Sequence, residues 1–67
     1  MEEKTNLVTN IGNGMFQINE RIRINGADIS PTQMNDVPIN GFQPSILVNR
    51  TAVGHYEGNT FVIERIR

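Results

Sequence analysis

The chain has 67 residues, no cysteine, one histidine and a formal net charge of −1. The missing cysteines exclude disulfides and thiolate zinc sites, and the balanced charge argues against a general nucleic-acid coat, which needs a basic excess. So short a chain buries only about 60% of its extended surface on folding. We expect one small domain over residues 1–67 that gains stability by self-association.

The N-terminal segment, MEEKTNLVTN, has acidic side chains and no apolar run, unlike a signal peptide. No stretch reaches the roughly 20 apolar residues of a membrane span. The sequence therefore predicts a cytoplasmic protein with no membrane partner. Its abundant isoleucine and asparagine suggest an AT-rich bacterial or phage gene.

The first predicted element is a β-hairpin over about 5–24. Apolar and polar residues alternate along its second half, which is the period of a half-buried strand. The pair Asn13-Gly14 is a strong signal for a two-residue turn. Such a turn would place Ile11 opposite Phe16.

A short helix is predicted next, at about 31–36. Ser30 has the character of an N-cap and Pro31 that of a first helical residue. Gln33 completes a capping box, and Pro38 discourages further helix.

An irregular connection follows, with a turn at Asn40-Gly41. Phe42 comes directly after this turn. A side chain of that size is expected to fill one edge of the core.

The second predicted hairpin covers about 45–66. A two-residue turn at Gly58-Asn59 fixes its register and places Tyr56 opposite Phe61. Both faces of this hairpin carry apolar residues, whereas a small monomeric sheet usually has one polar face. Either the sheet curls into a barrel or a second copy covers it.

Together these elements predict a mostly β fold, a small antiparallel barrel-like or curved sheet of two hairpins with one short helix. The two hairpins contain similar segments, FQINERI from Phe16 and FVIERI from Phe61. The second is one residue shorter, and one residue reverses facing in a strand. We therefore expect Ile66 to leave the face of Phe61 and Arg65 to take its place.

Five of the six basic residues are arginines, which favour bidentate contacts with carboxylate or phosphate. The predicted register places Arg50 across from Arg67, and opposed like charges are unfavourable without an anion between them. The arginines form two predicted clusters, Arg50 with Arg65 and Arg67, and Arg21 with Arg23. They bind an external phosphate or carboxylate, or they pair with the chain's own seven acids.

Tyr56 and Phe61 form a second candidate pair. Exposed, they would contact a protein partner or stack on a base; otherwise they pin the hairpin and face the core. His55 has no nucleophile or base at a recognisable spacing.

No motif in the chain assigns an enzymatic function, a cofactor or a metal. We expect a small non-enzymatic binding and assembly protein that acts through protein–protein contacts, as a homo-oligomer and with a host or partner protein. The alternative is a binder of a phosphorylated ligand, a nucleotide or nucleic acid, held by the arginines at a subunit interface. The candidate site residues are Arg50, Arg65, Arg67, Arg21, Arg23, Tyr56 and Phe61.

Overall fold

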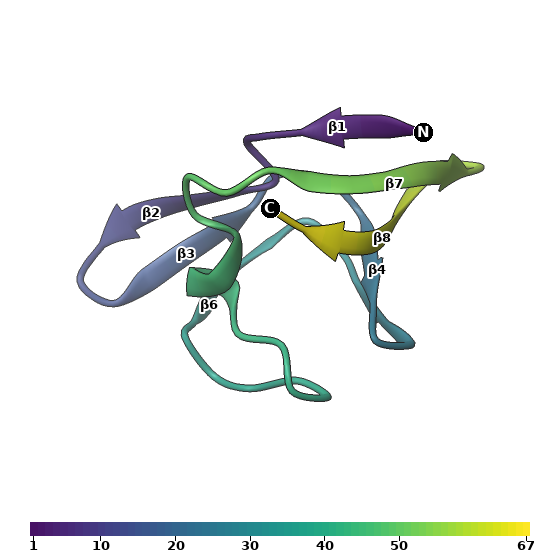
Figure 1. Cartoon of the computed structure of the whole chain (residues 1–67). Coiled ribbons are helices and arrows are strands. Elements are labelled where there is room, and N and C mark those ends of the chain that lie inside the picture. Colours follow the sequence, from purple (N-terminus) through teal and green to yellow (C-terminus); the bar gives the residue numbers. More distant parts are fainter.

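Eight β-strands and one short 3₁₀ helix build the protein, and the structure, a computed structural model, describes all of residues 1–67. A five-stranded sheet has the order β1-β7-β8-β4-β5, and a three-stranded sheet has the order β2-β3-β6 (Figure 1). The mostly β class is confirmed, but the strands do not close into a barrel. The elements are β1 (Glu2–Lys4), β2 (Val8–Gly12), β3 (Met15–Ile18), β4 (Ile22–Ile24), β5 (Ala27–Ile29), β6 (Thr32–Asn35), η1 (Pro44–Leu47), β7 (Ala52–Glu57) and β8 (Thr60–Ile66).

The predicted turn of the first hairpin is confirmed, but its predicted register is wrong by one residue. Asn13 and Gly14 have φ values of 56° and 75°, the two left-handed residues of a type I′ turn. Asn10 pairs with Phe16, and the register shifts before Gly12. Ile11 is therefore a bulge residue and is 45% exposed, instead of packing opposite Phe16.

The predicted extent of this hairpin, 5–24, is also wrong, because β3 ends at Ile18. Beyond it the backbone N–H of Asn19 donates to the Leu7 carbonyl at 2.9 Å, and the Asn19 side chain donates to the Asn6 carbonyl at 2.8 Å. These bonds are at the end of the antiparallel pairing between β2 and β3. The chain then passes from the three-stranded sheet into the five-stranded sheet.

The strand after this crossing, β4, pairs with β8 in parallel, with Ile22 beside Phe61. The Phe61 amide donates to the Arg21 carbonyl at 3.0 Å. The side chains of Ile22 and Phe61 are both 0% exposed. This pairing joins the two halves of the chain at the centre of the core.

The predicted helix at 31–36 is wrong, because this segment forms β6. It pairs antiparallel with β3, with Met34 beside Phe16, and the Gln17 side-chain amide donates to the Thr32 backbone carbonyl at 3.3 Å. Met34 also packs against the core. An isolated helix of six residues is marginal in water, whereas the strand satisfies the open edge of β3 and covers its buried side chains.

Phe42 fills the core as predicted and is 1% exposed. Asn40 and Gly41 form the predicted turn, with φ values of 49° and 81°, and Ile39 bridges to Phe42 across it. The following 3₁₀ helix, η1, was not predicted, although proline is common at a first helical position and Pro44 starts this one.

The second hairpin has the predicted turn and the predicted pairing of Tyr56 with Phe61. Gly58 alone is left-handed in this turn, with a φ of 61°, as in a type II′ turn. The hairpin is shorter than the predicted range 45–66, because β7 begins at Ala52 and the preceding residues form η1 and a turn.

A β-bulge at Glu64 changes the far end of this hairpin. Gly54 pairs with Ile63, but Val53 pairs with Arg65, so that Glu64 is the additional residue. The bulge returns Ile66 to the core, against which it packs, and leaves Arg65 exposed. The prediction that Ile66 loses the core face to Arg65 is therefore wrong.

One cluster of twelve buried apolar residues forms the core, with members from both sheets and from η1. The structure contains no helix of the length and apolar character that crossing a bilayer requires. The cluster consists of Leu7, Val8, Phe16, Ile18, Ile22, Ile24, Ile29, Phe42, Leu47, Ala52, Phe61 and Ile63.

The contact of β7 with β8 at Gly54 yields a stability prediction. A Cβ atom at Gly54 would overlap the Val62 carbonyl oxygen and lie 2.9 Å from its carbonyl carbon. We expect Gly54→Ala to lower the free energy of unfolding by about 1–3 kcal/mol, the usual cost of overpacking. Urea denaturation measures this change.

The matched control is Asn59→Ala, at an exposed residue of the turn that joins the same two strands. It should remain close to the wild-type stability. Equal losses for the two variants would show that close strand contact at Gly54 is not the cause.

Candidate binding site

One hollow of about 160 Å³ interrupts the protein surface, where the end of β4, the turn before η1, η1 itself and the end of β8 meet. Ile24, Phe42 and Ile63 give it an apolar floor, and each of them is a core residue. Exposed residues stand around them, including Ile46, which is 37% exposed. We call this feature the Arg65 hollow; it is lined by Ile24, Asn25, Gly41, Phe42, Ile46, Ile63, Glu64, Arg65 and Ile66.

The Arg65 hollow is smaller than the roughly 300–1,000 Å³ of typical small-molecule pockets. Its volume of about 160 Å³ suits one aliphatic side chain. Two charged residues line it, Arg65 and Glu64. The Glu64 carboxylate is held 2.7 Å from His55 Nδ1, whereas Arg65 has no acidic group within ion-pair distance. The uncompensated charge at the hollow is therefore positive.

The other candidate arginines do not gather around one ligand. Arg23 lies 2.7 Å from Asp28 and 3.1 Å from Glu57, so it is compensated within the chain. Arg21 contributes its backbone carbonyl to the β4–β8 pairing, and its guanidinium makes no ion pair. The predicted cluster of Arg21 with Arg23 thus separates into one compensated and one free side chain.

At the C-terminal end, the predicted opposition of Arg50 and Arg67 is wrong. The bulge shifts the register, and Thr51 exchanges two backbone hydrogen bonds with Arg67, of 2.8 and 3.3 Å. The Arg50 Nε donates to the Arg67 carbonyl at 2.9 Å, and the Arg67 guanidinium lies 2.6 Å from Glu3 on β1. Among these three arginines, only Arg65 has a side chain without a hydrogen bond in the chain.

Tyr56 and Phe61 form an edge-to-face pair, with ring centroids 5.1 Å apart and an interplanar angle of 67°. Phe61 is fully buried, whereas Tyr56 is 37% exposed. The Tyr56 hydroxyl donates to Glu20, and Lys4 bonds the same carboxylate at 3.2 Å. This pair attaches β1 and the crossing segment to the second hairpin.

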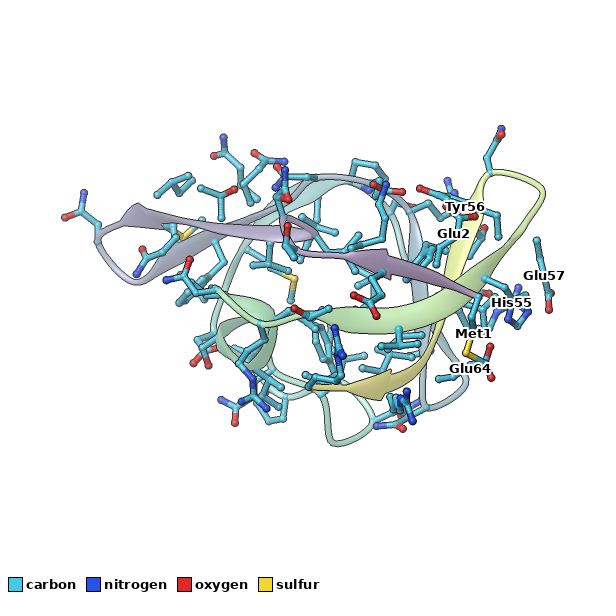
Figure 2. All side chains as sticks on the ribbon, turned by 45° about the horizontal axis from the view of Figure 1, so that its top comes forward. Met1, Glu2, His55, Tyr56, Glu57 and Glu64 are labelled. Atoms are coloured by element: carbon cyan, nitrogen blue, oxygen red, sulfur yellow. The ribbon has the colours of Figure 1, made fainter.

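His55 lies between two carboxylates on the outer face of the second hairpin. Its Nδ1 is 2.7 Å from Glu64 and its Nε2 is 3.0 Å from Glu57, and Figure 2 shows the three side chains gathered at one end of the molecule. The chain of contacts continues from Glu57 to Arg23 and Asp28. We call these five residues the His55 cluster.

Hydrogen bonds to Glu57 and Glu64 raise the pKa of His55 above its ordinary value of 6.5. The hydrogen bond from His55, assisted by the charge of Arg23, lowers the pKa of Glu57 below 4.5. Both effects favour the charged forms. The arrangement suits charge compensation across the strands, with a doubly protonated imidazole donating to both acids.

No group of three or more histidine and acidic side chains is arranged to hold a metal ion. Comparison of the chain with known protein families, with curated proteins and with solved structures gave no match. The site is therefore interpreted from its own geometry.

Sequence reasoning selected Arg65 but missed the apolar residues beside it. Ile24, Phe42, Ile46 and Ile63 are separated by up to 39 positions, from 24 to 63, and no local pattern joins them. Among these residues, only Phe42 was expected in the core from the sequence.

The His55 cluster predicts a pH-dependent contribution to stability. Because the pKa of His55 is raised in the folded chain, its contribution is fully present below pH 6.5 and is lost as the pH rises through the folded-state value. An NMR titration of the imidazole should give a pKa above 6.5, and Glu57→Gln or Glu64→Gln should each lower it. A pKa in either variant equal to that of the wild type would contradict the two-carboxylate arrangement.

Proposed function

We propose that this chain is a non-enzymatic binding and assembly module that acts through protein–protein contacts. The Arg65 hollow would receive an aliphatic side chain from a partner protein, and Arg65 would pair with an acidic side chain next to it. Self-association of the module would supply the additional buried surface that so short a chain lacks.

The observation that carries this proposal is that Arg65, whose guanidinium makes no ion pair in the chain, lines an apolar hollow of about 160 Å³. Buried apolar anchors surrounded by polar groups are the usual centres of protein interfaces. The volume suits one anchoring side chain, and the charge of Arg65 selects an acidic neighbour for it. Both requirements are met by a short segment in which an acidic residue adjoins a leucine.

The competing function is binding of a phosphorylated ligand by the arginines. Its support is the absence of acidic partners for Arg21 and Arg65, whose guanidinium groups make no ion pair in the chain. Against it, Arg23 and Arg67 are already paired with acids, and Arg50 with a backbone carbonyl. A ligand would have to displace these contacts, so the protein-binding proposal fits the geometry better.

The test is a titration of the protein with acetyl-Asp-Leu-amide. Binding is monitored by the NMR chemical shifts of the backbone amides and of the Arg65 Nε–H group. We expect shifts confined to Ile46, Ile63 and their neighbours in the Arg65 hollow. Acetyl-Asn-Leu-amide should bind about two to five times more weakly, because a surface ion pair contributes up to about 1 kcal/mol. Acetyl-Asp-Gly-amide should bind more weakly still, because it leaves the hollow empty.

Arg65→Gln should abolish the preference for aspartate over asparagine, while the matched variant Arg21→Gln should retain it. Shifts spread over the surface, or the same preference in the Arg65→Gln variant, would overturn the proposed site. Inorganic phosphate is titrated in parallel. Saturable shifts at both Arg21 and Arg65, without peptide binding, would favour the competing function.

A further inference from the structure

Two open sheets leave four strand edges unpaired, at β1, β5, β2 and β6. An unpaired edge presents free backbone donors and acceptors to any other strand, and proteins protect such edges with charges, bulges or short length. The four edges of this chain differ in this protection.

Three of the edges are protected. Every residue of β1, Glu2–Lys4, is charged. The β5 edge has only three residues and carries Asp28 at its centre. The β2 edge is interrupted by the bulge at Ile11. Each feature disfavours the regular pairing of another strand.

The fourth edge, β6, is one residue longer than β5 and has neither a charge nor a bulge. Its four residues are uncharged, and it contains no bulge and no proline. Thr32, Gln33 and Asn35 are exposed on it. Asp36, the first charge beyond it, is turned away from the edge, because its carboxylate accepts from the Ser45 amide at 3.0 Å and from the Ser45 hydroxyl at 2.8 Å.

We propose that β6 pairs antiparallel with β6 of a second copy of the chain. A two-fold axis beside Gln33 would join the three-stranded sheets of the two copies into one continuous six-stranded sheet. The inference rests on the self-association that is part of the proposed function, and it assigns the surface that is used.

The second copy is the occupant that the strand itself favours. A two-fold contact centred on Gln33 places this residue opposite its own counterpart, so a charge at this position would oppose a like charge. The sequence Thr32-Gln33-Met34-Asn35 avoids this penalty. Val37, which is 48% exposed just beyond the strand, adds apolar surface at each end of the contact.

The contact is small. A pairing of four-residue strands buries less than about 1,200 Å², which is the range of weak, transient interfaces. The dimer should therefore appear only as protein concentration rises into the micromolar to millimolar range. Sedimentation velocity over this range measures the dissociation constant.

The decisive experiment uses two variants of opposite charge, Gln33→Lys and Gln33→Glu, at an exposed residue whose side chain makes no hydrogen bond in the structure. Each variant alone should be monomeric at every concentration, because like charges would meet across the axis. An equimolar mixture should regain a dimer that contains one copy of each. A folded spectrum of each variant by circular dichroism shows that the loss is not unfolding.

Asn59→Lys, a charge added in an exposed turn, is the matched control and should sediment as the wild type. Wild-type protein that stays monomeric into the millimolar range would overturn the proposal, and so would a dimer that survives in both Gln33 variants. Arg65→Gln should leave the dimer intact. Failure of the Arg65 hollow and failure of the β6 contact are therefore separate results.

Discussion

The parallel pairing of β4 with β8 is the constraint on which the rest of this small fold depends. Ile22 and Phe61 meet there, both fully buried, and the Phe61 amide bonds the Arg21 carbonyl. A parallel pair needs a long connection, and here that connection contains β5, β6, η1 and β7. Forming the pair therefore brings both sheets onto one core. Without it, the β4–β5 hairpin would be separate from the β7–β8 hairpin, and a single hairpin cannot bury its apolar residues alone.

The two proposed surfaces arise from this arrangement. The Arg65 hollow lies where segments from the two halves of the chain meet imperfectly, and the bulge at Glu64 leaves Arg65 exposed there. The β6 edge is open because the sheets do not close on each other. The compensated charges, in particular the His55 cluster, lie on the outer face of the five-stranded sheet. These charges compensate one another on that face, whereas the guanidinium groups of Arg21 and Arg65 make no ion pair in the chain.

Short-range sequence patterns predicted the turns and the β class. The features that they did not predict depend on pairing between strands that are distant in the sequence. Asn13-Gly14 and Asn40-Gly41 impose their turns whatever surrounds them. The capping signals at 31–36 are equally local, but the open edge of β3 outweighed them and produced β6. The bulge at Glu64 depends on the fit of Ile66 into the core, which no short pattern contains. For the same reason Arg65 was found and the hollow beside it was not.

The central claim is that the Arg65 hollow is a site for an acidic–aliphatic segment of a partner protein. An experimental structure of the protein with acetyl-Asp-Leu-amide tests it most directly. The account predicts the leucine side chain on Phe42 and Ile63, with the aspartate carboxylate on the Arg65 guanidinium. A peptide bound elsewhere on the protein, or an empty hollow at saturating peptide, would contradict it.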